Sequence, residues 1–193
     1  QPLALIYVSK APLAPGIYRS VRAEYTEKRN IPAVSMSHDD VLNLLKGPRR
    51  IRLTTEVEKI RAKSQNVIGE VPGTLTDEDI LICGHYDTVR TVTGAHDNAA
   101  GTAIVLELAR ILAHEKLNRT ARFIAFGSEE LGLRGSQHHA ENPENTKNLR
   151  LCLNLDVHGI LLGNLNAIAL APEDLKSLLR FTAKELGIPL SIT

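Results

Sequence analysis

The sequence predicts an α/β protein: a three-layer α/β/α sandwich around a mostly parallel, mixed sheet. From about residue 65 onward, short strand-like runs alternate with longer segments of helical periodicity. This alternation is typical of parallel sheets whose faces are covered by helices. The runs are also apolar throughout, as expected for strands buried on both faces.

The elements of this region follow from local patterns. Strands are expected at residues 66–71, 79–84, 122–126, 149–155 and 168–170. A turn is expected at residues 72–74, because Pro and Gly stand there. Helices are expected at residues 98–115, 136–142 and 172–186. The first of these helices carries an apolar stripe at helical spacing, and Gly187 is placed to end the last one.

The first third of the chain has a different texture. Strands are expected at residues 3–8, 31–36 and 49–60. A helix is expected from Ser37 to Leu45, because Ser37 is a good N-cap and Gly47 with Pro48 stops the helix. We therefore expect two domains, residues 1–64 and residues 65–193.

The composition argues against several classes of protein. The 23 basic and 22 acidic residues give a net charge of +1, whereas nucleic-acid-binding domains are usually basic. No apolar run approaches the roughly 18 residues that span a bilayer. The only cysteines, Cys83 and Cys152, lie in apolar runs and are interpreted as small hydrophobic residues rather than a disulfide framework.

Polar side chains follow the buried strands, and others precede the long helix. They are His85, Asp87, Asp97, Glu129, Glu130 and Asp156. In an open α/β sheet, ligands bind outside the carboxyl ends of the strands. Unpaired charges at such a half-buried edge are costly, so we expect these groups to converge on a ligand.

Imidazole nitrogen and carboxylate oxygens without thiolates match the ligands of zinc in catalytic sites. A carboxylate that bridges two ions would form a two-metal hydrolase site. Glu129 and Glu130 are neighbours, so one can bind metal while the other serves as a general base. Asp87 is placed to hydrogen-bond the imidazole of His85, as carboxylates often do for a metal-binding histidine.

Four segments carry a family resemblance: GHYDT at 84–88, GAHDNAAG at 94–101, SEELGLRGS at 128–136 and NLD at 154–156. In this order they resemble the co-catalytic two-zinc aminopeptidase family. This family includes secreted bacterial leucyl aminopeptidases, glutamate carboxypeptidases and a non-catalytic relative, the transferrin receptor. The resemblance covers roughly residues 66–160.

The resemblance implies a role for each site residue. His85 and Asp156 would bind one zinc ion and Glu130 the other, with Asp97 as the bridging carboxylate. Glu129 would be the general base that takes a proton from the metal-bridging water. The Asp97–Asn98 peptide bond would be cis. His96 departs from the pattern, because relatives often have an acidic or small polar residue there.

The implied function is that of a secreted or exported zinc exopeptidase, an aminopeptidase that removes N-terminal residues from peptides. A carboxypeptidase, a dipeptidase or a glutaminyl cyclase relative remains an alternative on the same fold. A non-catalytic, receptor-like binding fragment is another, although such proteins are marked by the loss of metal residues. His138 and His139 are expected on the protein surface, and His158 is a candidate to line the cleft.

The resemblance also implies that the chain is incomplete at both ends. Residues 31–34 and the following helix resemble the end of a protease-associated domain, whose start would precede Gln1. The family pattern needs a further late histidine beside Glu130, and no histidine follows His158. We therefore expect a fragment that binds at most about one zinc ion tightly and has little peptidase activity by itself.

Overall fold

The computed structural model describes residues 4–8, 19–20, 32–47, 50–55, 58, 60–89, 92–159 and 165–193. The chain divides into two compact units, Gln1–Arg61 and Ala62–Thr193. Within the described residues, no helix is both long and apolar enough to cross a membrane.

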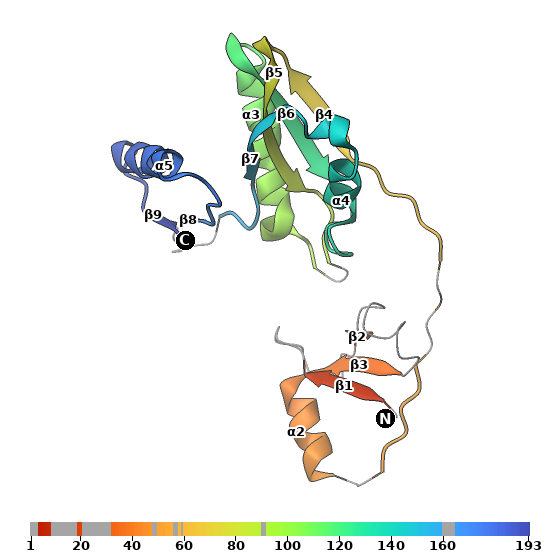
Figure 1. Ribbon diagram of the computed structural model, residues 1–193. Helices are drawn as coiled ribbons and strands as arrows, with labels where there is room; N and C mark the ends of the chain where they lie inside the picture. The colour runs from red at the N-terminus through yellow and green to blue at the C-terminus, as the bar shows by residue number, and fades with distance from the viewer. Residues whose placement is uncertain are drawn as a thin grey trace. The chain divides into compact units, whose positions relative to one another are not determined.

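The first unit contains a small sheet and one helix (Figure 1). Strands β1 (Leu5–Val8) and β2 (Arg19–Ser20) flank β3 (Ala33–Met36), parallel to β1 and antiparallel to β2. Helix α2 (His38–Lys46) begins as expected, because the Ser37 hydroxyl accepts a hydrogen bond from the Asp40 amide at 3.0 Å. A strand was expected at residues 49–60, but residues 50–55, 58 and 60 have no regular structure, and residues 49, 56, 57 and 59 lie outside the described residues. An alternating pattern makes a strand only where another strand pairs with it.

The second unit is built on a four-stranded sheet with the order β4-β6-β5-β7 (Figure 1). Strand β5 (Gly73–His85) is parallel to both β6 (Leu117–Phe126) and β7 (Leu149–Asn154). Strand β4 (Val67–Val71) is antiparallel to β6, which makes the sheet mixed and mostly parallel. The turn expected at residues 72–74 is wrong in extent. Strand β5 already begins at Gly73, whose amide donates to Thr120 Oγ1 at 3.2 Å.

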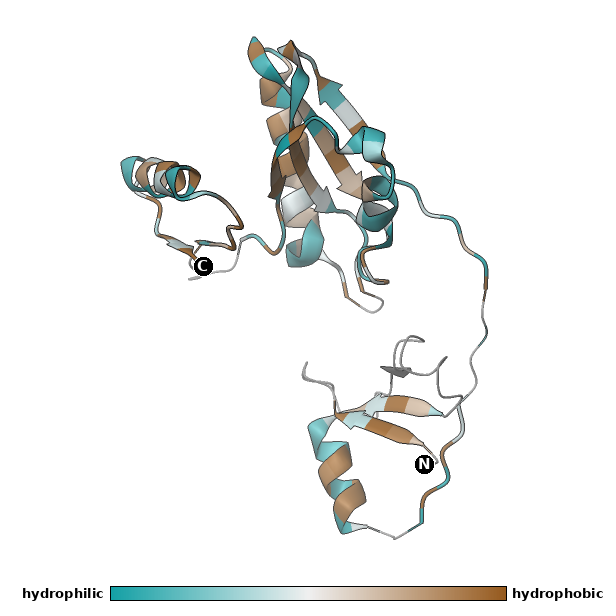
Figure 2. Cartoon of the chain, viewed as in Figure 1, coloured by the Kyte–Doolittle hydropathy of each residue, from teal (hydrophilic) through white to brown (hydrophobic). Residues whose placement is uncertain are grey.

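Helices cover both faces of this sheet. A kinked segment, η1 (Ala95–Ala99), in which Asp97 and Asn98 have non-helical backbone angles, leads into α3 (Ala100–Leu112). Helix α3 buries Val105 against Ile82 and Phe123 on one face of the sheet. On the other face, His139 of α4 (Arg134–Ala140) packs edge-on against Phe126 with the ring centres 5.8 Å apart. Figure 2 shows apolar residues concentrated in β5, β6 and α3. The three-layer arrangement is thus as predicted, but His139 is buried rather than exposed because its ring meets Phe126.

The C-terminal elements are β8 (Leu165–Ala167), α5 (Glu173–Glu185) and β9 (Leu190–Ile192), and a short 3-10 helix, η2 (Pro143–Asn145), precedes β7. Strands β8 and β9 pair in parallel. The strand expected at residues 168–170 is therefore wrong in position. Helix α5 ends as expected at Gly187, which has a φ of +65°. The amide of Ile188 there donates to the carbonyl of Ala183 at 2.8 Å.

Candidate metal centre

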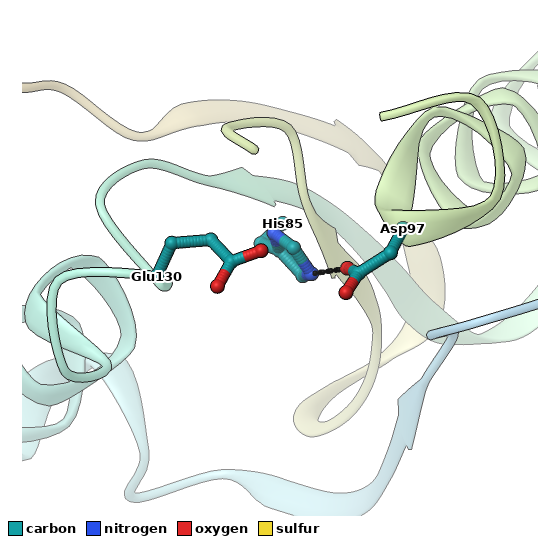
Figure 3. A group of neighbouring side chains, drawn as sticks. All are labelled: His85, Asp97 and Glu130. Carbon is teal, nitrogen blue, oxygen red and sulfur yellow. Dashed lines mark ion pairs between the residues drawn. The ribbon is translucent and has the colours of Figure 1, made fainter. Parts of the chain in front are cut away.

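Four chain segments bring the expected polar residues together. His85 is the last residue of β5, and Asp97 lies in η1. Glu130 lies in the turn after β6, and Asp156 follows β7 by two residues. Figure 3 shows the side chains of His85, Asp97 and Glu130 pointing toward one another. This is the carboxyl-end edge of the parallel strands β5, β6 and β7, where ligands bind in open α/β sheets.

The imidazole of His85 stands at the centre of the group. Its Nε2 atom lies 3.0 Å from Asp97 Oδ1 and 3.3 Å from Asp156 Oδ1. One ligand atom each from His85, Asp97 and Glu130 lie within 4.8 Å of one another. His85 is only 4% exposed, whereas the side chain of Asp97 is 49% exposed. The imidazole is therefore buried beneath carboxylates that reach toward solvent.

A hydrogen bond selects the tautomer of this imidazole. The Nδ1 atom of His85 lies 2.9 Å from the backbone oxygen of Asp87. A carbonyl oxygen only accepts, so Nδ1 carries the proton and Nε2 of the neutral ring presents its lone pair. The Thr102 hydroxyl donates to the backbone oxygen of His85 at 2.8 Å and fixes the end of β5. The ring is thus oriented to bind a metal ion through Nε2.

The Asp87 carboxylate does not make the expected hydrogen bond to the imidazole of His85. Its nearer oxygen is 3.7 Å from His85 Nδ1, and the hydrogen bond to that ring goes to the Asp87 backbone instead. The two carboxylate oxygens accept the backbone amides of Glu129 at 2.9 Å and Glu130 at 3.1 Å. Asp87 therefore acts on the site mainly by holding the turn that carries Glu129 and Glu130.

The electrostatics of the group favour a bound cation. Burial raises the pKa of Glu130, and the negative charges of Asp97 and Glu129 raise it further. Burial by itself lowers the pKa of His85. The carboxylates of Asp156, Glu129 and Asp97, together with the hydrogen bond to the Asp87 backbone, outweigh burial, so the pKa of His85 is raised overall. Negative charge crowded around one buried ring contributes to the rise of both pKa values, and a divalent cation would neutralise that charge.

The donor set fits zinc. Zinc binds imidazole nitrogen and carboxylate oxygen, and catalytic sites use three protein ligands with one position left open. His85, Asp97 and Asp156 would hold one ion, and Glu130 with Asp97 would contribute to a second. Glu129 shares the turn with Glu130, which brings a further carboxylate to the edge of the site.

Sequence reasoning assigned no role in the site to two residues at this edge, Asn98 and Thr102. Asn98 is 1% exposed, and its peptide bond with Asp97 is cis, as the resemblance implied. The available signal was an amide at the start of an apolar helix, where Asn often serves as a cap. His96 and His158, whose roles were left open, each have a buried Nε2 atom with no hydrogen-bond partner among the residues that the structure describes.

Comparison with known proteins gives consistent results. The sequence profile described as "Peptidase family M28" matches residues 66–187. Aminopeptidase YwaD of Bacillus subtilis is 42% identical over 100 residues, which are 50% of this chain and 22% of that protein. An aminopeptidase of Pseudomonas aeruginosa is 30% identical over 132 residues, covering 67% of this chain and 25% of that protein.

The fold resembles a solved structure as well. BSAP, a zinc aminopeptidase from Bacillus subtilis, matches with a TM-score of 0.72 and 26% identity, over 99% of this chain and 48% of that one. By sequence, the matched part of the chain spans 22% of the length of YwaD and 25% of the length of the Pseudomonas aeruginosa aminopeptidase.

Proposed function

Because the chain belongs to peptidase family M28, we propose that it carries metal-binding residues of a zinc aminopeptidase site that cleaves N-terminal residues from peptides. The observation that carries this proposal is the convergence of His85, Asp97 and Glu130 ligand atoms within 4.8 Å. The names of the relatives, aminopeptidase and zinc aminopeptidase, support the same reaction.

The residues take the following roles in the proposal. His85 and Asp156 would hold one zinc ion, Glu130 would hold the other, and Asp97 would serve as a ligand of both. The chemistry that zinc would supply when bound is a lower pKa for the attacking water and polarisation of the scissile carbonyl. Glu129 accepts the proton of that water and passes it to the leaving amine. Asp87 keeps Glu129 and Glu130 in place through their backbone amides.

The domain assignment is also a proposal. Residues 65–193 would form part of the peptidase domain, and residues 1–64 part of a protease-associated domain. The support for a boundary near residue 64 is the division of the chain into the compact units Gln1–Arg61 and Ala62–Thr193. Limited proteolysis tests this assignment: cleavage should concentrate between residues 50 and 65, and a cut pattern spread evenly over the chain would contradict it.

The substitution Glu129→Gln tests the general base. It keeps the size of the side chain but removes the proton acceptor, so kcat should fall by about 10²- to 10⁴-fold. Zinc content, measured by elemental analysis, should stay unchanged because Glu129 is not a ligand. The matched control is Glu141→Gln at the exposed end of α4, which should leave kcat unchanged.

A panel of substrates distinguishes the aminopeptidase from the alternative reactions. It should include aminoacyl anilides, acidic dipeptides and peptides with N-terminal glutamine. Cleavage of the anilides supports an aminopeptidase. Exclusive turnover of acidic dipeptides, or cyclisation of glutaminyl peptides, would contradict the aminopeptidase proposal and support one of the alternative reactions. Full activity of Glu129→Gln would refute the role of Glu129.

A further inference from the structure

The side chain of Asn98 joins two segments of the candidate metal centre. It is 1% exposed and lies where η1 meets α3. Its Nδ2 atom donates to the backbone oxygen of Leu155 at 2.8 Å. Its Oδ1 atom accepts the backbone amide of Gly101 at 3.0 Å. One amide therefore caps the start of α3 and also reaches the chain just beyond β7.

Both segments that Asn98 joins carry a candidate ligand. Asp97 precedes Asn98 in the chain, and Asp156 follows Leu155. Both carboxylates approach the same Nε2 atom of His85, at 3.0 and 3.3 Å. The hydrogen bond from Asn98 to Leu155 thus spans the gap between the two backbones that deliver these carboxylates.

The third segment, the end of β5, is tied to the other two. The amide of Leu155 donates to the backbone oxygen of Cys83 at 2.8 Å. The hydroxyl of Thr102, in α3, donates to the backbone oxygen of His85 at 2.8 Å. Hydrogen bonds therefore close a ring through the end of β5, the residue after β7 and the start of α3.

The segments in this ring of hydrogen bonds are in close backbone contact, because glycines stand where they meet. A Cβ atom on Gly84 would lie 2.8 Å from the backbone oxygen of Leu155. A Cβ atom on Gly101 would collide with the same oxygen and with the Asn98 amide. With no side chain between the segments, the length of the Asn98 side chain sets their separation.

We propose that Asn98 is a positioning residue that fixes the spacing of Asp97 and Asp156 around His85 and thereby sets the zinc affinity of the site. This inference rests on the proposed function. The position needs an amide, since one end donates and the other accepts. Partners that orient metal ligands from outside the coordination sphere typically affect metal affinity by about 10- to 100-fold.

Two substitutions distinguish the hydrogen bond that caps α3, accepted from Gly101, from the hydrogen bond that reaches Leu155. Asn98→Ser keeps a hydroxyl that can accept the Gly101 amide, as serine does at helix N-caps, but it is too short to reach Leu155. Asn98→Ala removes both bonds. The matched control is Asn145→Ala, which loses the hydrogen bond that Asn145 Nδ2 donates to the backbone oxygen of His139 at 2.9 Å, outside the metal centre.

Zinc affinity is measured on the purified protein by competition with a chelator, and the absorption spectrum of bound Co²⁺ reports the geometry of the ligands. We expect Asn98→Ser and Asn98→Ala to weaken zinc binding by about 10- to 100-fold and to alter the Co²⁺ spectrum. Asn145→Ala should change neither. Because Asn98→Ser retains the cap, its thermal stability should stay closer to that of the wild type than Asn98→Ala does.

The outcomes distinguish the two proposals. If the wild type binds zinc and Asn98→Ser binds it equally well with the same Co²⁺ spectrum, the positioning role is refuted and the proposed function stands. If Asn145→Ala weakens binding as much as Asn98→Ser, the effect is general destabilisation and the positioning role is again refuted. If the wild type does not bind zinc, the proposed function fails and this inference fails with it.

Discussion

At the scale of single residues, the candidate centre depends on which atom of each group faces the ligand. His85 presents Nε2 because Nδ1 is committed to the backbone oxygen of Asp87. Asp87 uses its carboxylate for another purpose, accepting the amides of Glu129 and Glu130. One residue therefore orients both the imidazole and the turn that carries the proposed base.

The substitution Asp87→Ala should impair catalysis without removing any ligand. The Glu129 and Glu130 amides lose their acceptor, so both side chains become less well placed. We expect kcat/KM to fall by about 10- to 100-fold, in the range seen for residues that support metal ligands, as measured in steady-state assays. The control is Asp174→Ala, which removes a carboxylate that accepts the Leu175 amide at 2.8 Å in α5. An unchanged kcat/KM in Asp87→Ala would contradict the role.

The residue types of the site could be predicted, but not their hydrogen-bond partners. The carboxyl ends of the strands pointed to His85, Glu130 and Asp156, because chemistry gathers at that edge. The hydrogen bond from the Glu129 amide to the Asp87 carboxylate joins residues 42 positions apart. The hydrogen bond from the Asn98 side chain to the backbone oxygen of Leu155 joins residues 57 positions apart. Such contacts depend on how closely two turns approach, which no local pattern specifies.

At the scale of elements, the register and extent of strands were harder to predict than their existence. The apolar run at residues 79–84 correctly indicated the buried half of β5. The strand nevertheless continues back to Gly73, with an irregularity between Leu75 and Asp79, because it pairs with the start of β6. Pairing partners also explain residues 50–55, whose alternation suggested a strand that the fold does not form.

The contact between α3 and the end of β7 should be intolerant of added volume. In Gly101→Ala, the new methyl group would push into the backbone oxygen of Leu155 and the amide of Asn98. We expect a loss of about 1–3 kcal/mol in the free energy of unfolding, typical of overpacking, as measured by urea denaturation. The matched control is Gly69→Ala in β4, where a Cβ atom meets nothing within 4 Å. Equal stability of the two variants would contradict the packing argument.

The contact of α4 with the sheet should make stability depend on pH. Burial lowers the pKa of His139, and the positive charges of Arg122 and His138 lower it further. The unfolded chain therefore takes up this proton at about pH 6.5, whereas the folded chain does so only at lower pH. Protons thus favour unfolding in that window, and the stability from His139 is present above about pH 6.5 and lost below it.

The substitution His139→Phe tests this contribution. It keeps an aromatic ring against Phe126 but removes the titrating group. Urea denaturation at pH 7.5 and at pH 5.5 should show a smaller loss of stability on acidification for the variant than for the wild type. An identical loss in both proteins would show that His139 does not contribute.

At the scale of the whole molecule, the proposed metal ligands all belong to one of the two compact units, Ala62–Thr193. The candidate ligands come from β5, η1, the turn after β6 and the chain after β7, all within Ala62–Thr193. Among the residues of Gln1–Arg61 that the structure describes, none belongs to the candidate metal-binding group. Zinc should therefore stabilise the second unit and leave the first unchanged.

Thermal unfolding with and without zinc tests this prediction. At a free zinc concentration of about 100 times Kd, binding to the folded state contributes about 2.7 kcal/mol. For a unit of this size, that free energy raises Tm by about 10 °C. Hydrogen exchange should show added protection at the ends of β5 and β7 and none in β1, β3 or α2. The variant His85→Ala should lose both effects, because it removes the one nitrogen ligand of the group. Protection of both units, or a Tm rise that persists in His85→Ala, would mean that zinc acts elsewhere on the chain.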